Sequence, residues 1–282
     1  MKIETICICG AGTMGSGIAE LFAINNFPVI LFDPSISALE TAGKSFERNL
    51  QDLAAKGRIS YDDRDRIRQR IHITNDLGAC KSAIVIEAII ENEQAKIDLF
   101  DQLSRLNSKE TIFATNTSSL SVSRLAGNIF NPRRFVGMHF FNPARRMKLV
   151  EVVKGDKTAD DVIQTIVSLA KELGKVPVIC KDSPGFIVNR VARPYYLESL
   201  RLLEELNINV EAIDTLLEAT GFKLGPFKLM DLIGNDINYS VSDSIYQQLG
   251  GPQRLKPSMI QKQKLDKGEL GRKSGKGYYR YN

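Results

Sequence analysis

Tryptophan is absent from this chain of 282 residues, and histidine occurs only twice, as His72 and His139. Any chemistry that needs an imidazole as a base therefore has two candidates. Long apolar runs are also lacking: there is no stretch of about eighteen apolar residues, and no basic leader with a small-residue cleavage site precedes the first apolar segment. These absences predict a protein without a membrane span or secretory signal, and we expect it in the cytoplasm.

Cysteine is scarce as well. Cys7, Cys9, Cys80 and Cys180 lie inside apolar stretches and do not follow the spacing of metal-ligand motifs. Cysteine in such a setting is typically a small, reduced core side chain. We therefore expect neither disulfide bonds nor a metal site.

Positive charge is in slight excess, with 38 Lys and Arg against 33 Asp and Glu and a net charge of +5. No basic motif interleaved with aromatic residues accompanies this excess, so we expect an anionic small ligand and no nucleic acid. The densest charged run, KGRISYDDRDRIRQR at 56–70, alternates in sign, which is typical of a solvated helical arm. In the alternative, Lys56 or Arg58 contacts the phosphates of a ligand.

Short β-rich runs alternate with helical patterns through the first 180 residues. The runs are IETICIC, PVILF, SAIVIEAII, TIFAT, RFVGMHFF, KLVEVV and VPVIC. This alternation predicts an α/β domain built on a mostly parallel sheet. After KDSPGF the periodicity is helical, so we expect domains at 1–184 and 185–282, the second all-α. The last segment, GRKSGKGYYRYN, is rich in glycine and basic residues and is expected to be mobile.

The segment CGAGTMGSG, residues 9–17, carries the pattern Gly-x-Gly-x-x-Gly between an apolar strand and an apolar helix. In a dinucleotide-binding turn the first glycine makes the tight turn, the second admits the pyrophosphate and the third lets the helix pack on the strand. The helix N-terminus then faces the phosphates. The residues assigned to this turn are Gly10, Gly12, Thr13, Met14 and Gly15.

Asp33 ends the strand that follows this helix. A carboxylate at this place accepts hydrogen bonds from ribose hydroxyls and repels a 2′-phosphate, so NAD is favoured over NADP. The alternative is a simple turn beside an unrelated acid.

His139 ends the apolar run RFVGMHFF where a strand passes into a loop, and ligands of open α/β sheets bind at such strand ends. If the next strand, KLVEVV, folds back beside it, the Glu151 carboxylate reaches the imidazole, fixes one tautomer and stabilises the imidazolium. A lone histidine at a strand end is otherwise structural. His72, in IHITNDL, is expected to be packed or half-exposed.

Two further polar segments contain candidate ligand-binding residues. ATNTSSLS follows the run TIFAT, so Asn116, Ser118 and Ser119 are expected in a loop that contacts substrate or cofactor, with a helix cap as the alternative. The segment PGFIVNR places Asn189 in the first helix of the second domain. If the Pro-Gly break is a tight hinge, Asn189 faces the sheet. In the alternative, Asn189 is an ordinary surface residue.

Taken together, these motifs resemble the 3-hydroxyacyl-CoA dehydrogenase family, including its bacterial 3-hydroxybutyryl-CoA members. The resemblance rests on GAGTMGSGIA, EAIIEN, ATNTSSLS, GMHFFNP, MKLVEVV, PGFIVNR and GRKSGKGYY, which follow one another along the chain. It implies a Rossmann-like NAD-binding domain whose sheet ends in antiparallel strands, followed by a helical domain that forms a homodimer. The implied reaction is oxidation of a 3-hydroxyacyl-CoA thioester, as in fatty acid β-oxidation.

The resemblance also implies roles for single residues. His139 is the general base, Glu151 is its partner, and Ser118 and Asn189 hold the substrate. The implied cofactor-lining residues are Glu91, Lys96, Asn116, Ser118, Asn142 and Lys273, the last of which draws the basic tail over the nucleotide.

The chain departs from the family after FNP, where Ala144, Arg145 and Arg146 replace the usual apolar residues and proline. The two arginines either point to solvent or bind a second carboxylate on the acyl group. Because VNRVARPYY resembles 3-hydroxyadipyl-CoA dehydrogenases, a dicarboxylic thioester is the alternative to a short-chain one, with Arg146 and Lys56 as substrate ligands. A dehydrogenase of free hydroxy acids and a catalytically silent relative are further alternatives.

Overall fold

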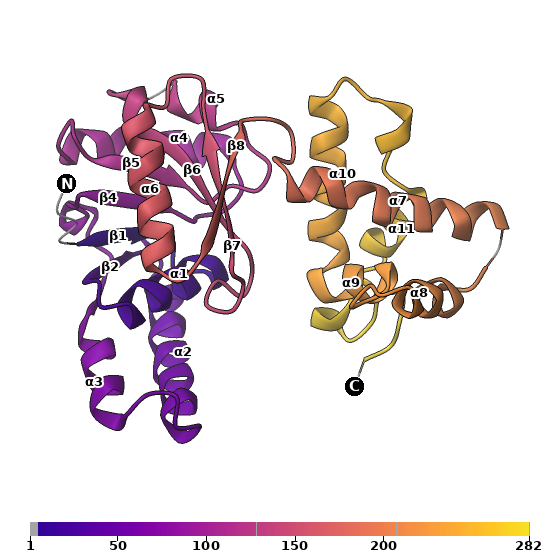
Figure 1. The fold of residues 1–282 in the computed structure, drawn as a ribbon, viewed down its shortest axis with the longest axis horizontal. Coiled ribbons are helices and arrows are strands. Elements are labelled where there is room, and N and C mark those ends of the chain that lie inside the picture. The colour runs from indigo at the N-terminus through magenta and orange to yellow at the C-terminus, as the bar shows by residue number, and fades with distance from the viewer. Residues whose placement is uncertain (1–4, 128, 207, 282) are drawn as a thin grey trace. The chain divides into compact units, whose positions relative to one another are not determined.

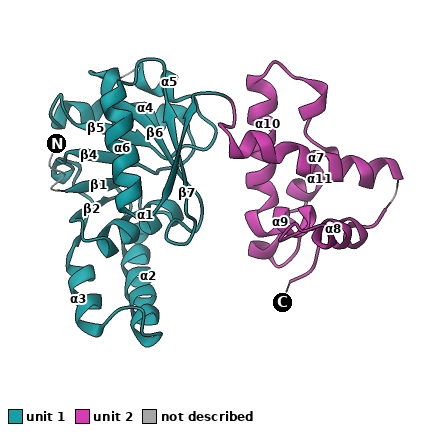
Figure 2. Cartoon of the chain, viewed as in Figure 1, with its two compact units in different colours: residues 1–183 teal, residues 184–282 magenta. Residues whose placement is uncertain are grey.

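The computed structural model describes residues 5–127, 129–206 and 208–281. The chain divides into two compact units, residues 1–183 and 184–282 (Figure 2). The first unit is an α/β structure with an eight-stranded sheet and the second is helical, which confirms the predicted fold class. No helix in the described ranges is long and apolar enough to cross a membrane.

The sheet of the first unit has the strand order β3-β2-β1-β4-β5-β6-β7-β8 (Figure 1). Six strands are parallel: β1 (Ile6–Cys9), β2 (Val29–Phe32), β3 (Ile71–Thr74), β4 (Ile84–Glu87), β5 (Ile112–Thr115) and β6 (Phe135–Phe140). β7 (Leu149–Lys154) runs antiparallel to β6, and β8 (Val176–Lys181) is parallel to β7. The sheet thus ends in strands of reversed direction, as the resemblance implied.

One strand, β3, is absent from the predicted runs. It lies at the edge of the sheet, where only Ile71 of its four residues is buried. Of the two expected environments of His72, packed or half-exposed, the packed one is wrong, because this edge leaves His72 exposed.

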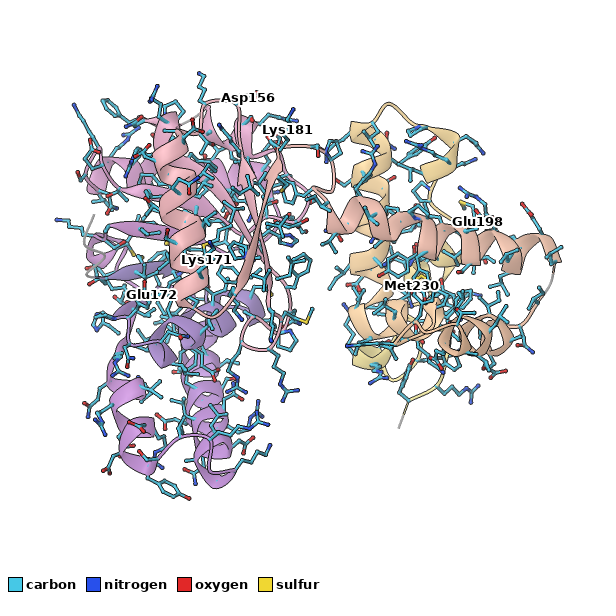
Figure 3. The ribbon with its side chains drawn as sticks, viewed as in Figure 1. Asp156, Lys171, Glu172, Lys181, Glu198 and Met230 are labelled. Atoms are coloured by element: carbon cyan, nitrogen blue, oxygen red, sulfur yellow. The ribbon has the colours of Figure 1, made fainter. Side chains whose placement is uncertain are left out.

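Alternation with a period of two distributes the side chains of each strand between the two faces of the sheet. Ile6 and Ile8 of β1 share one core with α1 (Thr13–Ile24), α2 (Ile36–Ala55) and α6 (Asp160–Glu172). On the opposite face α4 (Glu93–Leu106) contributes Phe100, whose ring packs edge-on against Phe113 and Phe135. α6 crosses in front of the sheet in Figure 1, and its last turn carries exposed charged residues (Figure 3).

α2 and α3 (Tyr61–Gln69) lie side by side as a helical hairpin (Figure 1). Arg68 of α3 bonds to Glu47 of α2 through Nε and Oε1, at 2.9 Å, and Ile67 alone among the residues of α3 is buried. The charged run at 56–70 is therefore a solvated helical arm, as predicted. Lys56 is exposed at the end of α2.

Short helices connect several of these elements in the first unit. They are η1 (Leu77–Ala79), α5 (Val122–Ala126) and η2 (Pro132–Arg134). Ser121 precedes α5, and its side chain caps the amino end of the helix by accepting a hydrogen bond from the Arg124 backbone N–H.

The second unit is built from helices that pack around their own core. They are α7 (Val188–Leu206), α8 (Val210–Ala219), α9 (Pro226–Ile233), α10 (Asn235–Gln248), η3 (Gln253–Leu255), α11 (Met259–Asp266) and η4 (Arg272–Ser274). Tyr196 and Leu200 of α7 meet Phe227 and Met230 of α9 in that core, and Met230 lies among the helices in Figure 3. Asn209 caps α8, because its side chain accepts a hydrogen bond from a backbone N–H of the first turn.

The carboxyl-terminal segment is held by Asp231, a buried residue of α9. Its carboxylate accepts hydrogen bonds from the backbone N–H groups of Tyr278 and Tyr279, both at 2.9 Å, and from the Tyr281 hydroxyl at 3.0 Å. A Cβ at Gly277 would lie only 2.0 Å from Asp231 Oδ1, so this glycine allows a close approach. The prediction of a mobile tail is therefore wrong, because its glycine reflects packing against a buried acid.

Candidate active site

His139 and Glu151 stand directly opposite each other in the antiparallel pair of β6 and β7. Side chains in such positions lie on the same face of the sheet, with Cβ atoms about 4.5–5.5 Å apart. Glu151 Oε2 lies 2.7 Å from His139 Nδ1, and both side chains are buried. A proton on Nδ1 then points at the carboxylate, so Nε2 is the basic nitrogen of the neutral ring.

The glycine turn between β1 and α1 combines two different requirements. Gly10 has a φ of +109°, and a Cβ there would lie 2.5 Å from the Ala88 carbonyl oxygen. A Cβ at Gly15 would lie 1.8 Å from the Gly10 carbonyl oxygen. The protein's own packing therefore demands glycine at both positions.

Gly12 differs from its two neighbours in the motif. A Cβ at this position meets no atom of the described residues within 4 Å, and its φ of −68° suits any residue. The protein's own packing therefore does not demand glycine at position 12, and the bare backbone leaves open space beside it. Thr13 and Met14 follow as the first residues of α1, exposed and half-buried respectively.

Asp33 follows β2 and is bonded to the glycine turn. Its Oδ2 accepts a hydrogen bond from the Ala11 backbone N–H at 2.8 Å, and its Oδ1 accepts one from the Ser35 N–H at 2.9 Å. Each carboxylate oxygen has a second lone pair that suits a ribose hydroxyl. Asp33 therefore fixes the turn and offers acceptors beside it.

Lys96 is buried and lies between two acidic residues. Its Nζ is 2.5 Å from Glu87 Oε1 and 3.2 Å from Glu91 Oε2. The Thr115 hydroxyl donates to the other oxygen of Glu87 at 2.7 Å. Removing the charge of Lys96 or of Glu87 would leave the other charge buried without a partner, which would lower the stability of the protein by about 3–5 kcal/mol. Lys96 is thus placed as a counter-ion beneath the strand ends.

Glu91 organises the loop that follows β5. It accepts hydrogen bonds from the Thr117 hydroxyl at 2.6 Å and from the backbone N–H groups of Ser118 and Ser119, at 2.9 and 3.1 Å. Burial alone would raise the pKa of Glu91, but the Lys96 charge and these hydrogen bonds lower it overall. Glu91 is therefore ionised at neutral pH and fixes the backbone that carries Ser118.

The loop after β6 is also held from below. Lys175, which is buried, donates from Nζ to the carbonyl oxygens of Ala144 at 2.6 Å and Met147 at 2.8 Å. Asn116 Oδ1 accepts a hydrogen bond from the Phe140 N–H at 2.8 Å and so joins the ends of β5 and β6. Asn142 lies exposed in this loop.

The two arginines of this loop have different environments. Arg145 Nη1 lies 2.8 Å from Oε1 of Glu20, a buried acid of α1, so Arg145 takes neither of the two expected orientations. Burial raises the pKa of Glu20, although Asn49 and Arg145 oppose the effect. Arg146 is exposed.

Two of the predicted site residues belong to the second unit. Asn189 is half-buried in the first turn of α7, and its carbonyl oxygen accepts a hydrogen bond from Arg193 Nε at 2.9 Å. Lys273 Nζ lies 2.6 Å from Asp236 Oδ2, which ties η4 to α10 within this unit.

Glu87, Glu20 and Lys175 are absent from the predicted site residues. Glu87 could have been predicted from the sequence, since it is an acid at the end of the otherwise apolar strand IVIE. Glu20 and Lys175 give none, because their partners Arg145 and Ala144 are distant in sequence.

Residues 5–183 match the model of the 3-hydroxyacyl-CoA dehydrogenase NAD binding domain, and residues 185–281 match that of the 3-hydroxyacyl-CoA dehydrogenase C-terminal domain. The chain belongs to the 3-hydroxyacyl-CoA dehydrogenase family. As a member of this family the chain is an oxidoreductase that uses NAD, the cofactor predicted from the glycine turn and Asp33. The open space at Gly12 and the acceptors of Asp33 fit that cofactor.

Individual relatives of this dehydrogenase differ in their names. The 3-hydroxyadipyl-CoA dehydrogenase of Escherichia coli is 42% identical over 281 residues, which cover 99% of this chain and 59% of that protein. A probable 3-hydroxybutyryl-CoA dehydrogenase of Deinococcus radiodurans is 38% identical, over 97% of this chain and 99% of the relative. The crystal structure of (S)-3-hydroxybutyryl-CoA dehydrogenase from Ralstonia eutropha matches the whole of both chains, with a TM-score of 0.95 at 35% identity.

The contrast between Gly12 and Gly15 gives a test of the cofactor site in this dehydrogenase. Gly12→Ala should leave the melting temperature within about 2 °C of the parent, because its Cβ enters open space, but raise the KM for NAD at least about tenfold. Gly15→Ala should instead lower the melting temperature by about 5 °C or more, because its Cβ meets the Gly10 carbonyl. An unchanged KM in a stable Gly12→Ala variant would show that the cofactor lies elsewhere.

Proposed function

We propose that this dehydrogenase transfers a hydride between NAD and C3 of a short-chain 3-hydroxyacyl-CoA thioester, with His139 as general base and acid. The observation that carries the proposal is the contact between His139 Nδ1 and Glu151 Oε2, at 2.7 Å, at the carboxyl end of β6. Ligands of open α/β sheets bind at such strand ends. The glycine turn ends β1 in the same sheet and supports a cofactor on the same edge.

In the proposed reaction His139 Nε2 accepts the proton of the substrate's 3-hydroxyl group. Glu151 stabilises the imidazolium that forms, because its carboxylate is buried against Nδ1. Bound NAD supplies the acceptor for the hydride that leaves C3. In the direction of reduction His139 returns the proton to the 3-keto oxygen. A positioned general base is typically worth ~10²–10⁴-fold in rate.

Ser118 and Asn189 are proposed to hold the thioester, as the resemblance implies. Support for Ser118 comes from the loop geometry, since Glu91 fixes its backbone N–H at 2.9 Å. The proposed cofactor site also includes Glu91, Lys96, Asn142 and Lys273. Glu91 contributes by fixing the backbone of the loop after β5, and Lys96 contributes by its ion pair with Glu91. Lys56 is proposed to meet ligand phosphates, because it is exposed on the α2–α3 arm.

His139→Ala should lower kcat for reduction of acetoacetyl-CoA by ~10²–10⁴-fold while leaving the dissociation constant of NADH within about twofold. His72→Ala is the matched control, because His72 is exposed in β3 and should keep full activity. Glu151→Gln should also lower kcat, since an amide does not stabilise the imidazolium as a carboxylate does. Stopped-flow and steady-state absorbance of NADH measure these effects, and a loss below tenfold for His139→Ala would remove it as the base.

A dicarboxylic thioester is the second candidate substrate. The name of the Escherichia coli relative and the exposed Arg146 guanidinium favour it. The pairing of Arg145 with Glu20 argues against a two-arginine carboxylate site, since that guanidinium already has a buried acidic partner.

A kinetic panel separates these substrates. With NADH we expect kcat/KM for acetoacetyl-CoA to exceed that for 3-ketoadipyl-CoA, and free acetoacetate to be a poor substrate because it lacks the CoA moiety. Arg146→Ala should then leave acetoacetyl-CoA reduction within about twofold. A tenfold preference for the dicarboxylic thioester that disappears in Arg146→Ala would favour the second candidate, and turnover of the free acid alone would contradict both.

A homodimer formed through the second unit, a cytoplasmic location and a role in β-oxidation complete the proposal. The second unit exposes several large apolar side chains, which supports an interface on it: Leu206, Leu216, Phe222 and Met259. Light scattering should give twice the chain mass of 31.4 kDa. Phe222→Glu should shift that mass toward the monomer, and a monomeric parent would contradict the dimer.

A further inference from the structure

We propose that Cys7, Cys9 and Cys80 form a binding site for copper(I), a soft metal ion of low coordination number, behind the glycine turn. Four core thiols without a metal site are the expectation from sequence. The structure instead brings three of them together from two separate segments, and their Sγ atoms all lie within 4.8 Å of one another.

The geometry of the three thiols suits trigonal coordination. Cys7 and Cys9 are two residues apart in β1, so their side chains emerge on the same face of the strand, with the Sγ atoms 3.8 Å apart. Cys80 reaches them from the segment between η1 and β4. Three sulfur ligands at about 2.3 Å from a metal in one plane are about 4.0 Å apart. The thiols therefore need only small movements to bind an ion.

The three cysteines of the cluster have to lose their thiol protons when an ion binds. The side chains of all three residues are fully buried, and all three cysteines are free thiols. Thiolate is the form of cysteine that binds metals.

The ligand set points to copper(I) and away from zinc. Structural zinc sites are almost always four-coordinate. Within the described part of the chain, the group contains three cysteines and no fourth His, Asp or Glu ligand. Soft thiolate ligands select copper(I), which also binds three ligands in a plane. Binding replaces thiol protons, which leave to the solvent, and the oxidation state of copper does not change.

The position of the cluster links it to the glycine turn. Cys80 lies in a connecting segment that Asn107 holds, through Nδ2 to the Cys80 carbonyl oxygen at 2.9 Å and Oδ1 to the Ser82 N–H at 3.0 Å. Cys9 directly precedes Gly10 and pairs in register with Glu87, so an ion would bind next to the elements that shape the proposed cofactor site.

The experiment uses the full chain, reduced and kept free of oxygen, titrated with copper(I) in competition with a coloured copper(I) chelator. We expect one copper(I) per chain to be retained after desalting, and X-ray absorption to show sulfur ligands only. Cys80→Ser and Cys9→Ala should each weaken binding at least about tenfold. Cys180→Ser is the matched control, because Cys180 lies outside the cluster, in β8, and should bind copper(I) like the parent.

Circular dichroism and the melting temperature identify any variant that fails to fold. The copper(I) retained by the parent is then compared with that retained by whichever of Cys80→Ser and Cys9→Ala is folded. Three outcomes would overturn the proposal: retention by the parent no higher than by a folded cluster variant, an equal loss in Cys180→Ser, or preferential binding of Zn²⁺ under the same conditions. All readouts are metal content, so they are independent of whether the proposed dehydrogenase reaction is correct.

Discussion

The antiparallel pairing of β6 with β7 is the constraint on which the candidate active site depends. Because the chain reverses direction after β6, β7 returns at once, and residues 139 and 151 become direct neighbours. Side chains alternate between the faces of a sheet, so a shift of one residue would turn Glu151 away from His139. Val150 and Val152, on either side of Glu151, belong to the core on the opposite face. Hydrophobic packing on one side of the sheet therefore sets the hydrogen bond on the other.

Charged side chains, some of them buried, hold the loops at the carboxyl ends of the strands. Lys96 lies between Glu87 at the end of β4 and Glu91, which in turn bonds the backbone after β5. Asp33 does the same for the turn after β1. These groups are ionised or hydrogen-bonded before any ligand binds, so the loops are preorganised at little further cost in entropy. Glu91 and Lys96, which the family resemblance implies as cofactor-lining residues, therefore support the loops by their ion pair.

The sequence was sufficient for the elements that have strong local signals. Apolar runs predicted every strand except β3, whose edge position removes the need for a buried face. The approach of Glu151 to His139 was also predictable, since a direct reversal of the chain is a local event. Contacts between segments that are distant in sequence could not be predicted, because no local pattern indicates them. These contacts are Arg145 with Glu20, Lys175 with the 144–147 loop, and Cys80 with β1. The tail was mispredicted for the same reason, because glycine content does not tell flexibility from close packing against Asp231.

The attachment of residues 277–281 to Asp231 has a consequence for biosynthesis. The first unit contains its last strand by Lys181, so it is able to fold while the remaining helices are still being translated. The second unit gains three of the donors to its buried acid, Asp231, only when Tyr278, Tyr279 and Tyr281 emerge from the ribosome. The hydrogen bonds around Asp231 are therefore complete only once residues 277–281 have been translated.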